Sequence, residues 1–305
     1  MFDAGTLKGV LTALVTPLTE HGLVDEPAVE RLVEHVLAGG VSGLLPLGST
    51  GETASLDEPA RRTMLAAVIK AARGRVPVIC GVAQSHVAAA EAEVAAAASL
   101  GADAALVAPP FYYLVDQATV LAFYRAVATS SQLPILLYNI PQFTKVVAEP
   151  GTVATLAREG TIKGMKDSSR DFEYFELVCG ATRDLPRFRI FTGSDTMLLA
   201  SLAMGGAGTI CGAANVAPEW AVRIYDDVQR GDWKAAREHQ DQLVELVMRL
   251  RGGVFPAAIK AALELQGICS HWLAKPIAPL DARTRAALGE RLADWGLLTA
   301  AQRSR

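Results

Sequence analysis

Several long segments of the chain carry apolar residues at helical spacing. In the first of them, Val29, Leu32 and Val36 recur every three or four positions, as on one face of a helix, and two glycines follow at its end. On this basis helices are predicted over residues 25–40, 57–74, 86–101, 116–131, 150–160, 171–182, 196–206 and 218–232.

Short runs rich in apolar residues precede these helices. They predict strands over residues 10–18, 43–48, 77–83, 104–110, 134–141, 162–168, 189–195 and 208–215. The runs are continuous rather than alternating, which is typical of a parallel sheet covered on its outer face. Eight strand-then-helix units, spaced by about 25 residues, predict an α/β fold of the (β/α)8 TIM-barrel type. A doubly wound sheet is the alternative, but no G-x-G-x-x-G turn follows the first predicted strand.

The chain continues beyond the eighth unit with a further helical pattern, including residues 233–250 and 255–267. We therefore expect a barrel over residues 1–232 and a C-terminal helical extension over residues 233–305. No linker or low-complexity tract separates the two, so the extension is expected to pack on the barrel as part of a single structural unit.

The composition is that of an ordinary globular protein. Of the 305 residues, 51% are hydrophobic and 20% are charged, and the formal net charge is −3. Because the chain has no basic block, neither nucleic acid nor an anionic membrane is expected as a partner. The apolar runs stay shorter than the roughly 18 residues of a membrane span, and the N-terminus lacks the basic start of a secretory signal. A cytoplasmic location is expected.

Cysteine and histidine usage indicates neither disulfides nor a metal centre. The four cysteines, at positions 80, 179, 211 and 269, form no C-x-x-C pair, which fits a reducing compartment. The five histidines are scattered, with no H-x-x-x-H or H-E-x-x-H pattern. No metal site is therefore predicted.

Candidate chemistry lies at the strand ends, because TIM-barrel active sites are built at the C-terminal ends of the strands. Lys166 ends the sixth predicted strand and shares one face with Gly164, while Tyr138 ends the neighbouring fifth strand. If these faces point inward, Lys166 and Tyr138 project into the barrel side by side. Gly164 is then expected to leave room beside the lysine.

Other strand ends carry "GSTGE" (48–52), "PPFYY" (109–113), "GSD" (193–195) and "GAAN" (212–215). Each feature alone has an ordinary interpretation: a lysine at a strand end is most often solvated, a tyrosine packs, and a glycine-rich turn does nothing or holds a phosphate. Their occurrence together, each at the end of its own strand, favours a functional site. A neutral lysine amine in such a site attacks a carbonyl and forms a Schiff base.

These segments, together with "TPLTEHGLVD" (16–25), "YNIP" (138–141), "KDSS" (166–169) and "GGAGTICGAANVAPE" (205–219), resemble a known family over essentially the whole chain. The chain is similar to the dihydrodipicolinate synthase/N-acetylneuraminate lyase family of Schiff-base-forming barrel enzymes. The resemblance implies that Lys166 forms an imine with the keto group of pyruvate or a 2-keto acid, and that Tyr138 transfers protons above it.

The resemblance also assigns roles to the loop that begins at Gly48. Ser49 and Thr50 would hold the carboxylate of the keto acid through their N–H groups and hydroxyls. Thr50 would also pass a proton between Tyr138 and Tyr112, which family members lend across a subunit interface. "PPFYY" leaves open whether Tyr112 or Tyr113 is the lent residue.

Further residues implied by the resemblance line the site beside the lysine. Gly193 and Ile210 would contribute backbone atoms near Lys166. The family implies no metal and no organic cofactor, because the lysine imine supplies the electrophile. It also implies a homo-oligomer, a dimer of dimers in many members, since the lent tyrosine requires a second subunit.

One position departs from the family pattern. In the synthases that make dihydrodipicolinate, an arginine lies two residues after the proline of this motif, where it binds the carboxylate of the aldehyde. Here Phe143 occupies that place, and no neutral residue replaces a bidentate guanidinium clamp. Lys145 lies two residues further on and offers a flexible point charge instead.

The leading hypothesis is therefore a class I aldolase or lyase that makes or breaks a C–C bond to pyruvate, acting on a 2-keto-3-deoxy acid or a related aldehyde adduct. Authentic 4-hydroxy-tetrahydrodipicolinate synthase, which joins pyruvate and aspartate semialdehyde, is an alternative that Phe143 disfavours. Two others are a decarboxylating sugar-acid dehydratase acting through the same imine and a barrel that binds a keto acid without turnover.

Overall fold

Eight parallel strands form the centre of the molecule, in a computed structural model that describes residues 2–303. The strands are β1 (Gly9–Ala13), β2 (Gly43–Leu45), β3 (Ile79–Val82), β4 (Ala104–Val107), β5 (Ile135–Asn139), β6 (Gly164–Asp167), β7 (Arg189–Thr192) and β8 (Gly208–Cys211). Their order in the sheet is β2-β1-β8-β7-β6-β5-β4-β3. The sheet is nearly closed by a parallel bridge from Leu44 to Val78, beside which the Leu44 N–H donates to the Pro77 carbonyl at 3.0 Å.

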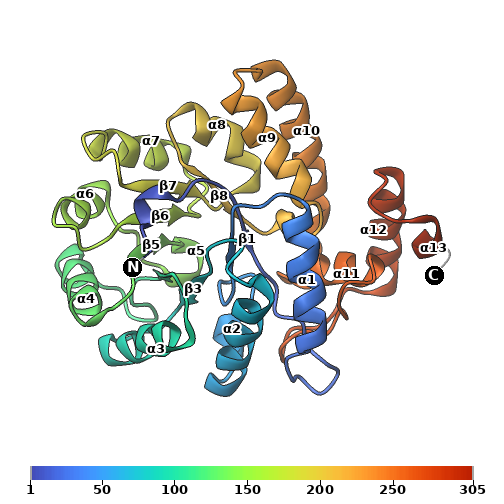
Figure 1. Cartoon of the computed structure of the whole chain (residues 1–305), viewed down its shortest axis with the longest axis horizontal. Coiled ribbons are helices and arrows are strands. Elements are labelled where there is room, and N and C mark those ends of the chain that lie inside the picture. Colours follow the sequence, from blue (N-terminus) through green and yellow to red (C-terminus); the bar gives the residue numbers. More distant parts are fainter. Residues whose placement is uncertain (1, 304–305) are drawn as a thin grey trace.

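Helices alternate with the strands and surround them (Figure 1). They are α1 (Glu26–Ala38), α2 (Glu58–Ala72), α3 (Val87–Leu100), α4 (Gln117–Ser130), α6 (Pro150–Arg158), α7 (Phe172–Ala181), α8 (Leu198–Ala203) and α9 (Pro218–Gln229). Aspartates start several of them, since Asp25, Asp57 and Asp116 each accept a hydrogen bond from the N–H three residues on. The predicted TIM barrel is confirmed.

The strands are shorter than the apolar runs that predicted them. The first run was expected to continue to residue 18 and the last to residue 215, but β1 ends at Ala13 and β8 at Cys211. The chain beyond these points forms loops and short 3₁₀ helices, including η2 (Thr53–Ser55), η3 (Asp195–Met197) and η4 (Ala213–Asn215). A buried loop is as apolar as a buried strand, so hydrophobicity alone does not mark where pairing stops.

Two apolar layers hold the barrel together. Strand residues such as Leu11, Leu106, Leu136 and Phe191 form a cluster inside the barrel. A larger cluster packs the outer face of the sheet against the helices. Tyr138 belongs to the inner cluster, so the inner face of β5 leads directly to the candidate site.

The C-terminal segment consists of α10 (Trp233–Leu250), α11 (Ala257–Leu265), α12 (Ala282–Asp294) and α13 (Ala300–Arg303). Helix α10 runs beside α9, and α12 and α13 lie at the periphery near α1 (Figure 1). The division of the chain into a barrel over 1–232 and an extension over 233–305 stays a prediction. Within residues 2–303, no helix combines the length and apolar character that a bilayer crossing requires.

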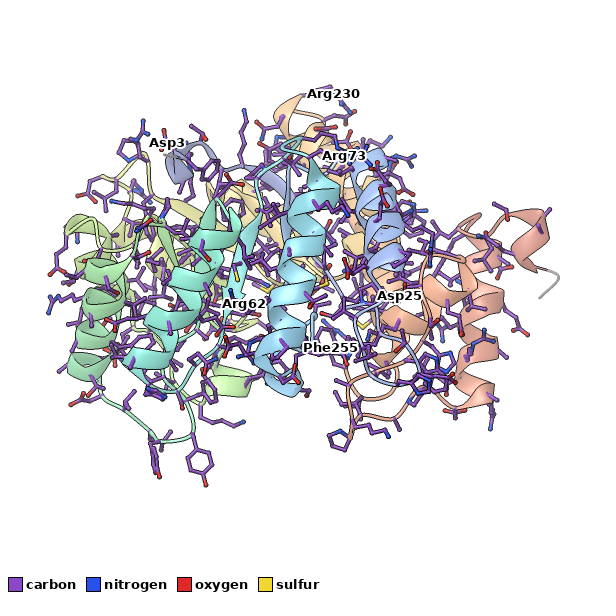
Figure 2. The ribbon with its side chains drawn as sticks, turned by 60° about the horizontal axis from the view of Figure 1, so that its bottom comes forward. Asp3, Asp25, Arg62, Arg73, Arg230 and Phe255 are labelled. Atoms are coloured by element: carbon purple, nitrogen blue, oxygen red, sulfur yellow. The ribbon has the colours of Figure 1, made fainter. Side chains whose placement is uncertain are left out.

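The two ends of the barrel differ in what they carry. Asp3, Arg73 and Arg230 mark the end where the strands begin, and Phe255, just before α11, lies toward the opposite end (Figure 2). Phe255 also lines the candidate site. The C-terminal segment therefore reaches the end of the barrel at which the strands terminate.

Candidate active site

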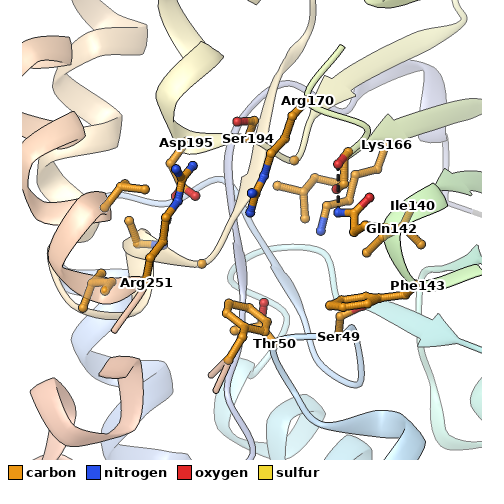
Figure 3. A pocket seen from close by; sticks show the side chains of 18 of the residues that line it. Ser49, Thr50, Ile140, Gln142, Phe143, Lys166, Arg170, Ser194, Asp195 and Arg251 are labelled. Carbon is orange, nitrogen blue, oxygen red and sulfur yellow. Dashed lines mark hydrogen bonds between the residues drawn. The ribbon is translucent and has the colours of Figure 1, made fainter. Parts of the chain in front are cut away.

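A cavity of about 420 Å³ opens at the C-terminal ends of the strands. Its wall combines residues from the ends of β5 to β8 with residues from α10 and α11 (Figure 3). The residues predicted from the sequence that line it are Ser49, Thr50, Tyr138, Phe143, Lys166, Gly193 and Ile210.

Lys166 and Tyr138 face each other inside this cavity. The strand register pairs them directly, and the Lys166 Nζ atom lies 4.6 Å from the centroid of the Tyr138 ring. Both side chains are buried, with exposed fractions of 4% and 6%. The inward orientation expected from strand parity is confirmed, and the aromatic face stabilises a positive charge on the lysine nitrogen or on an iminium formed from it.

Space for the Lys166 side chain comes from Gly193, at the end of β7. A Cβ atom at position 193 would lie 2.7 Å from Lys166 Cε and 2.0 Å from Ser168 Oγ. The expectation that Gly164 leaves room beside the lysine is wrong. A Cβ atom there would instead meet the carbonyl oxygen of Arg189 at 2.5 Å, so Gly164 permits close approach of β6 and β7.

The loop after β2 supplies free hydrogen-bond donors to the cavity. Within residues 2–303, the backbone N–H groups of Ser49 and Thr50 donate to no protein acceptor. Leu47 and Glu52 both adopt a left-handed backbone, with φ of 61° and 59°, which is unfavourable for side-chain-bearing residues. The Thr16 hydroxyl donates to the Gly51 carbonyl at 2.7 Å and holds the strained loop in place.

The Ser49 hydroxyl lies within hydrogen-bond distance of the Tyr138 hydroxyl. Ser49 Oγ and the Tyr138 hydroxyl oxygen lie 3.5 Å apart. Thr50 also lines the cavity, but no hydrogen bond joins it to Tyr138 in the described part of the chain. Gly48 lines a second cavity, of about 310 Å³, which shares Ser49, Tyr138 and Phe143 with the first.

Tyr112 and Tyr113 do not line either of these cavities. They lie in the loop after β4, with exposed fractions of 86% and 76%, and their rings meet edge to face at 5.1 Å. Tyr112 adopts a left-handed backbone with φ of 82°. Their neighbour Phe111 does line the second cavity.

Phe143 lies at the mouth of both cavities, on the short helix α5 (Pro141–Thr144), and its side chain is 57% exposed. Lys145 does not replace the missing guanidinium. Its Nζ donates to the Gln142 carbonyl at 3.0 Å, and it lines neither cavity. The carboxylate clamp of the family pattern is therefore absent from this wall.

The side chains of Asp167 and Asn215 make hydrogen bonds within the protein. Asn139 Nδ2 donates to Asp167 Oδ1 at 2.8 Å across β5 and β6, and burial raises the pKa of Asp167 above its ordinary value. Asn215 in "GAAN" donates to the carbonyls of Ala13 and Gly212 and accepts from the Val15 N–H. Its amide group therefore links the end of β1 to the loop after β8. These hydrogen bonds do not support the interpretation of this segment as a phosphate-binding turn.

Three polar residues in the cavity wall are not found by the sequence analysis. Gln142 lies on α5, Arg170 follows β6, and Arg251 follows α10. The "KDSSRDF" segment contains Arg170, but nothing in its spacing tells which way a loop side chain points. Arg251 comes from the C-terminal extension, whose packing against the barrel mouth has no sequence signature. Within residues 2–303, no group of three or more His, Cys, Asp or Glu residues is arranged to hold a metal ion.

Comparisons with known proteins agree over nearly the full length. The model of the dihydrodipicolinate synthetase family matches residues 6–294. A 4-hydroxy-tetrahydrodipicolinate synthase from Phenylobacterium zucineum is 40% identical over 294 residues, which cover 95% of this chain and 98% of that protein. An uncharacterized DapA-like lyase from Halobacterium salinarum is 36% identical, covering 96% and 95% of the two chains.

Solved structures give the same result. YagE, a prophage protein of the dihydrodipicolinic acid synthase family from E. coli K12 whose crystal structure contains pyruvate, matches with a TM-score of 0.92 at 29% identity. The match covers 96% of this chain and 99% of that one.

Proposed function

The chain belongs to the dihydrodipicolinate synthetase family, and from that premise we propose that it makes or breaks a C–C bond to pyruvate through an imine on Lys166. As a family member it is a lyase of the class I aldolase type. The observation that carries the assignment of the nucleophile is the position of Lys166, buried in the cavity 4.6 Å from the Tyr138 ring.

In the proposed reaction the Lys166 amine attacks the keto carbon. The Tyr138 hydroxyl donates the proton with which the former carbonyl oxygen leaves as water. The product is an iminium that draws electrons from the adjacent carbons. No metal or organic cofactor is needed in this scheme, since the iminium is the electron sink.

Cleavage of a 4-hydroxy-2-keto acid follows from the same intermediate. A base removes the proton of the 4-hydroxyl, the C3–C4 bond breaks, and its electron pair moves to the iminium nitrogen, which leaves an enamine and releases an aldehyde. Protonation of the enamine at C3 and hydrolysis of the imine give pyruvate and the free amine. Condensation is the reverse sequence.

The free N–H groups of Ser49 and Thr50 suit the carboxylate of the keto acid. A loop with unpaired amides concentrates positive partial charge and binds an anion without an arginine. Bound there, the keto acid would have its carboxylate on the β2 loop and its keto carbon near Lys166. The Ser49 hydroxyl, 3.5 Å from that of Tyr138, is the proposed proton relay in place of Thr50.

The exposed tyrosines support a homo-oligomer. Tyr112 does not reach the cavity of its own chain, and its side chain is 86% exposed. In the proposal, Tyr112 or Tyr113 of a second subunit approaches the Ser49 and Tyr138 hydroxyls through the second cavity, where Phe111 already lies. Such an arrangement requires at least a dimer, and a dimer of dimers contains two such dimers.

A second candidate is 4-hydroxy-tetrahydrodipicolinate synthase. The names of the relatives favour it, including one at 40% identity. The exposed phenyl ring of Phe143 at the cavity mouth disfavours it, because it supplies no group for the carboxylate of aspartate semialdehyde. A coupled assay with pyruvate and aspartate semialdehyde separates the two, since turnover at a normal synthase rate establishes the second candidate.

The proposed imine is tested by incubating the protein with pyruvate and borohydride and measuring its intact mass. We expect one reduced pyruvate adduct per chain, located on Lys166 by peptide mapping and absent from Lys166→Arg. Saturable binding of pyruvate without an adduct would indicate a non-catalytic keto-acid-binding barrel. A reduced pyruvate adduct on a lysine other than Lys166 would overturn the assignment of the nucleophile.

A further inference from the structure

Two arginines extend into the cavity from elements that are far apart in the sequence. Arg170 comes from the loop after β6, and Arg251 from the C-terminal end of α10. Figure 3 shows the Arg170 guanidinium directed into the space that Lys166 and Thr50 also border, and the Arg251 guanidinium at the side of the same cavity, toward Asp195. Both arginines line the same cavity, and the pKa of Arg251 is lowered mainly by partial burial and further by the positive charge of Arg170.

Neither guanidinium is neutralised by an ion pair. Within residues 2–303, no Asp or Glu lies within salt-bridge distance of Arg170 or Arg251, whereas Arg61 is paired with Glu93 at 2.9 Å. In the described part of the chain, the Arg251 side chain makes one hydrogen bond, to the sulfur of Met248 at 3.6 Å. The other guanidinium N–H groups of Arg170 and Arg251 have no protein acceptor there and are available to a ligand.

Asp195 also lines the cavity and acts on Arg251, but it does not occupy the guanidinium. Its Oδ1 accepts the Ala213 N–H at 2.9 Å, and its distance from Arg251 exceeds that of an ion pair. Asp195 therefore reduces the positive field of the pair without removing its hydrogen-bond donors.

The backbone of Arg170 is strained. Its φ is 64°, in the left-handed region, where a side-chain-bearing residue is unfavourable and glycine is not. An unpaired arginine held at such a position beside a reactive cavity points to a role in binding, because strain of this kind gathers at functional sites.

We propose that Arg170 and Arg251 together bind a negatively charged group, a carboxylate or a phosphate, at the end of the substrate remote from the imine. This inference rests on the proposed function and gives it a substrate class: 2-keto acids that carry a second anionic terminus. Arg170 and Arg251 come from other walls of the cavity than Phe143, and their forked donors match a planar carboxylate or a phosphate.

Equilibrium binding by isothermal titration calorimetry tests the proposal with matched ligand pairs. 2-Oxoadipate and 2-oxohexanoate have the same length and differ in a terminal carboxylate against a methyl group. 2-Keto-3-deoxy-6-phosphogluconate and 2-keto-3-deoxygluconate differ in a phosphate. Because both are 4-hydroxy-2-keto acids, which the wild type is proposed to cleave, this pair is titrated into proteins that also carry Lys166→Arg. We expect the anionic member of at least one pair to bind roughly 10- to 100-fold more tightly, and the pair that does so identifies the group.

Three variants locate the effect. Arg170→Gly and Arg251→Met are each expected to reduce the preference for the anionic ligand at least about tenfold. Arg170→Gly should also unfold at the same or a higher temperature, because it relieves the left-handed strain, so its loss of binding is not a loss of folding. The matched control is Arg249→Met, which removes an exposed arginine of α10 that does not line the cavity and should keep the preference.

The proposal is overturned if the anionic ligand binds less than about threefold more tightly in both pairs. It is also overturned if the preference for the anionic ligand persists in Arg170→Gly or in Arg251→Met, or if Arg249→Met loses it too. Failure of the proposed function is recognised separately. Wild-type protein that yields no borohydride adduct with pyruvate lacks the imine, and the calorimetric comparison of the ligand pairs still reports whether the arginines bind an anion.

Discussion

The Nζ atom of Lys260 lies 2.5 Å from a carboxylate oxygen of Glu52, and both side chains are completely buried. Lys260 also donates to the Trp272 carbonyl at 2.6 Å, and the second Glu52 oxygen accepts the Ala274 N–H at 2.7 Å. The pair therefore joins the active-site loop after β2 to α11 and to the segment that follows α11. Since Glu52 lies two residues after Thr50, this contact helps to fix the proposed carboxylate site.

Removing one partner of this pair should be strongly destabilising. Glu52→Gln or Lys260→Met is expected to lower the free energy of unfolding by about 3–5 kcal/mol, because each leaves a buried charge without its counter-charge. The double variant should be less destabilised than the sum of the two. Urea unfolding measures all three.

A surface pair provides the control for this comparison. Glu30 and Arg73 lie 2.9 Å apart with both side chains mostly exposed, so Glu30→Gln should cost less than about 1 kcal/mol. Equal losses in Glu30→Gln and Glu52→Gln would contradict the importance given to the buried pair.

Gly193→Ala should strongly reduce activity without unfolding the protein. The added Cβ would lie 2.7 Å from Lys166 Cε, so the lysine must move, and a displacement of about 1 Å at a reacting group costs about 100-fold in rate. Steady-state kcat with a cleavable 2-keto acid, together with circular dichroism, measures both effects. Gly180→Ala on α7 is the matched control, because its Cβ would meet no atom within 4 Å. Full activity in Gly193→Ala would show that the lysine does not need this space.

Ser49→Ala and Thr50→Val separate two roles of the β2 loop. Because the Ser49 hydroxyl is the one 3.5 Å from that of Tyr138, Ser49→Ala should lower kcat by about 10- to 100-fold. Thr50→Val should mainly raise the KM for the keto acid. Steady-state kinetics of both variants over a range of substrate concentrations separates the effect on kcat from the effect on KM. The opposite pattern would return the relay to Thr50, as the family resemblance first suggested.

The sequence predicted the barrel, the strand that presents Lys166 and the inward orientation of Tyr138, because periodicity and strand parity are local properties. The sequence did not show whether the hydroxyl of Ser49 or that of Thr50 reaches Tyr138, since side chains in a loop do not alternate between two faces as they do in a strand. It also assigned to Gly164 the space that Gly193 provides, because the register between β6 and β7 decides which residue of the adjacent strand lies beside Lys166. Arg170 and Arg251 were missed for a related reason: only the tertiary fold places the loop after β6 and the end of α10 around the same cavity.

Stability should respond to pH through Asp167. Burial raises the pKa of this carboxyl in the folded protein, so the folded state holds its proton more tightly than the unfolded state does. The contribution of Asp167 to stability is therefore lost as the pH rises from about 3.9, the ordinary carboxyl value, through the raised value. Asp167→Asn cannot ionise and retains an acceptor for Asn139. The free energy of unfolding of wild type minus that of Asp167→Asn should fall as the pH rises across this window and be constant above it.

Asp281 provides a control of opposite sign. It is the N-cap of α12, and hydrogen bonds from Thr284 lower its pKa, so its contribution is present above the ordinary carboxyl pKa and is lost as the pH falls. The difference between wild type and Asp281→Asn should therefore grow as the pH rises, since asparagine caps the helix without the charge. Urea unfolding of the three proteins at closely spaced acidic pH values gives both slopes. Slopes of the same sign for Asp167 and Asp281 would contradict the opposite effects of burial and of N-capping on these two carboxyls.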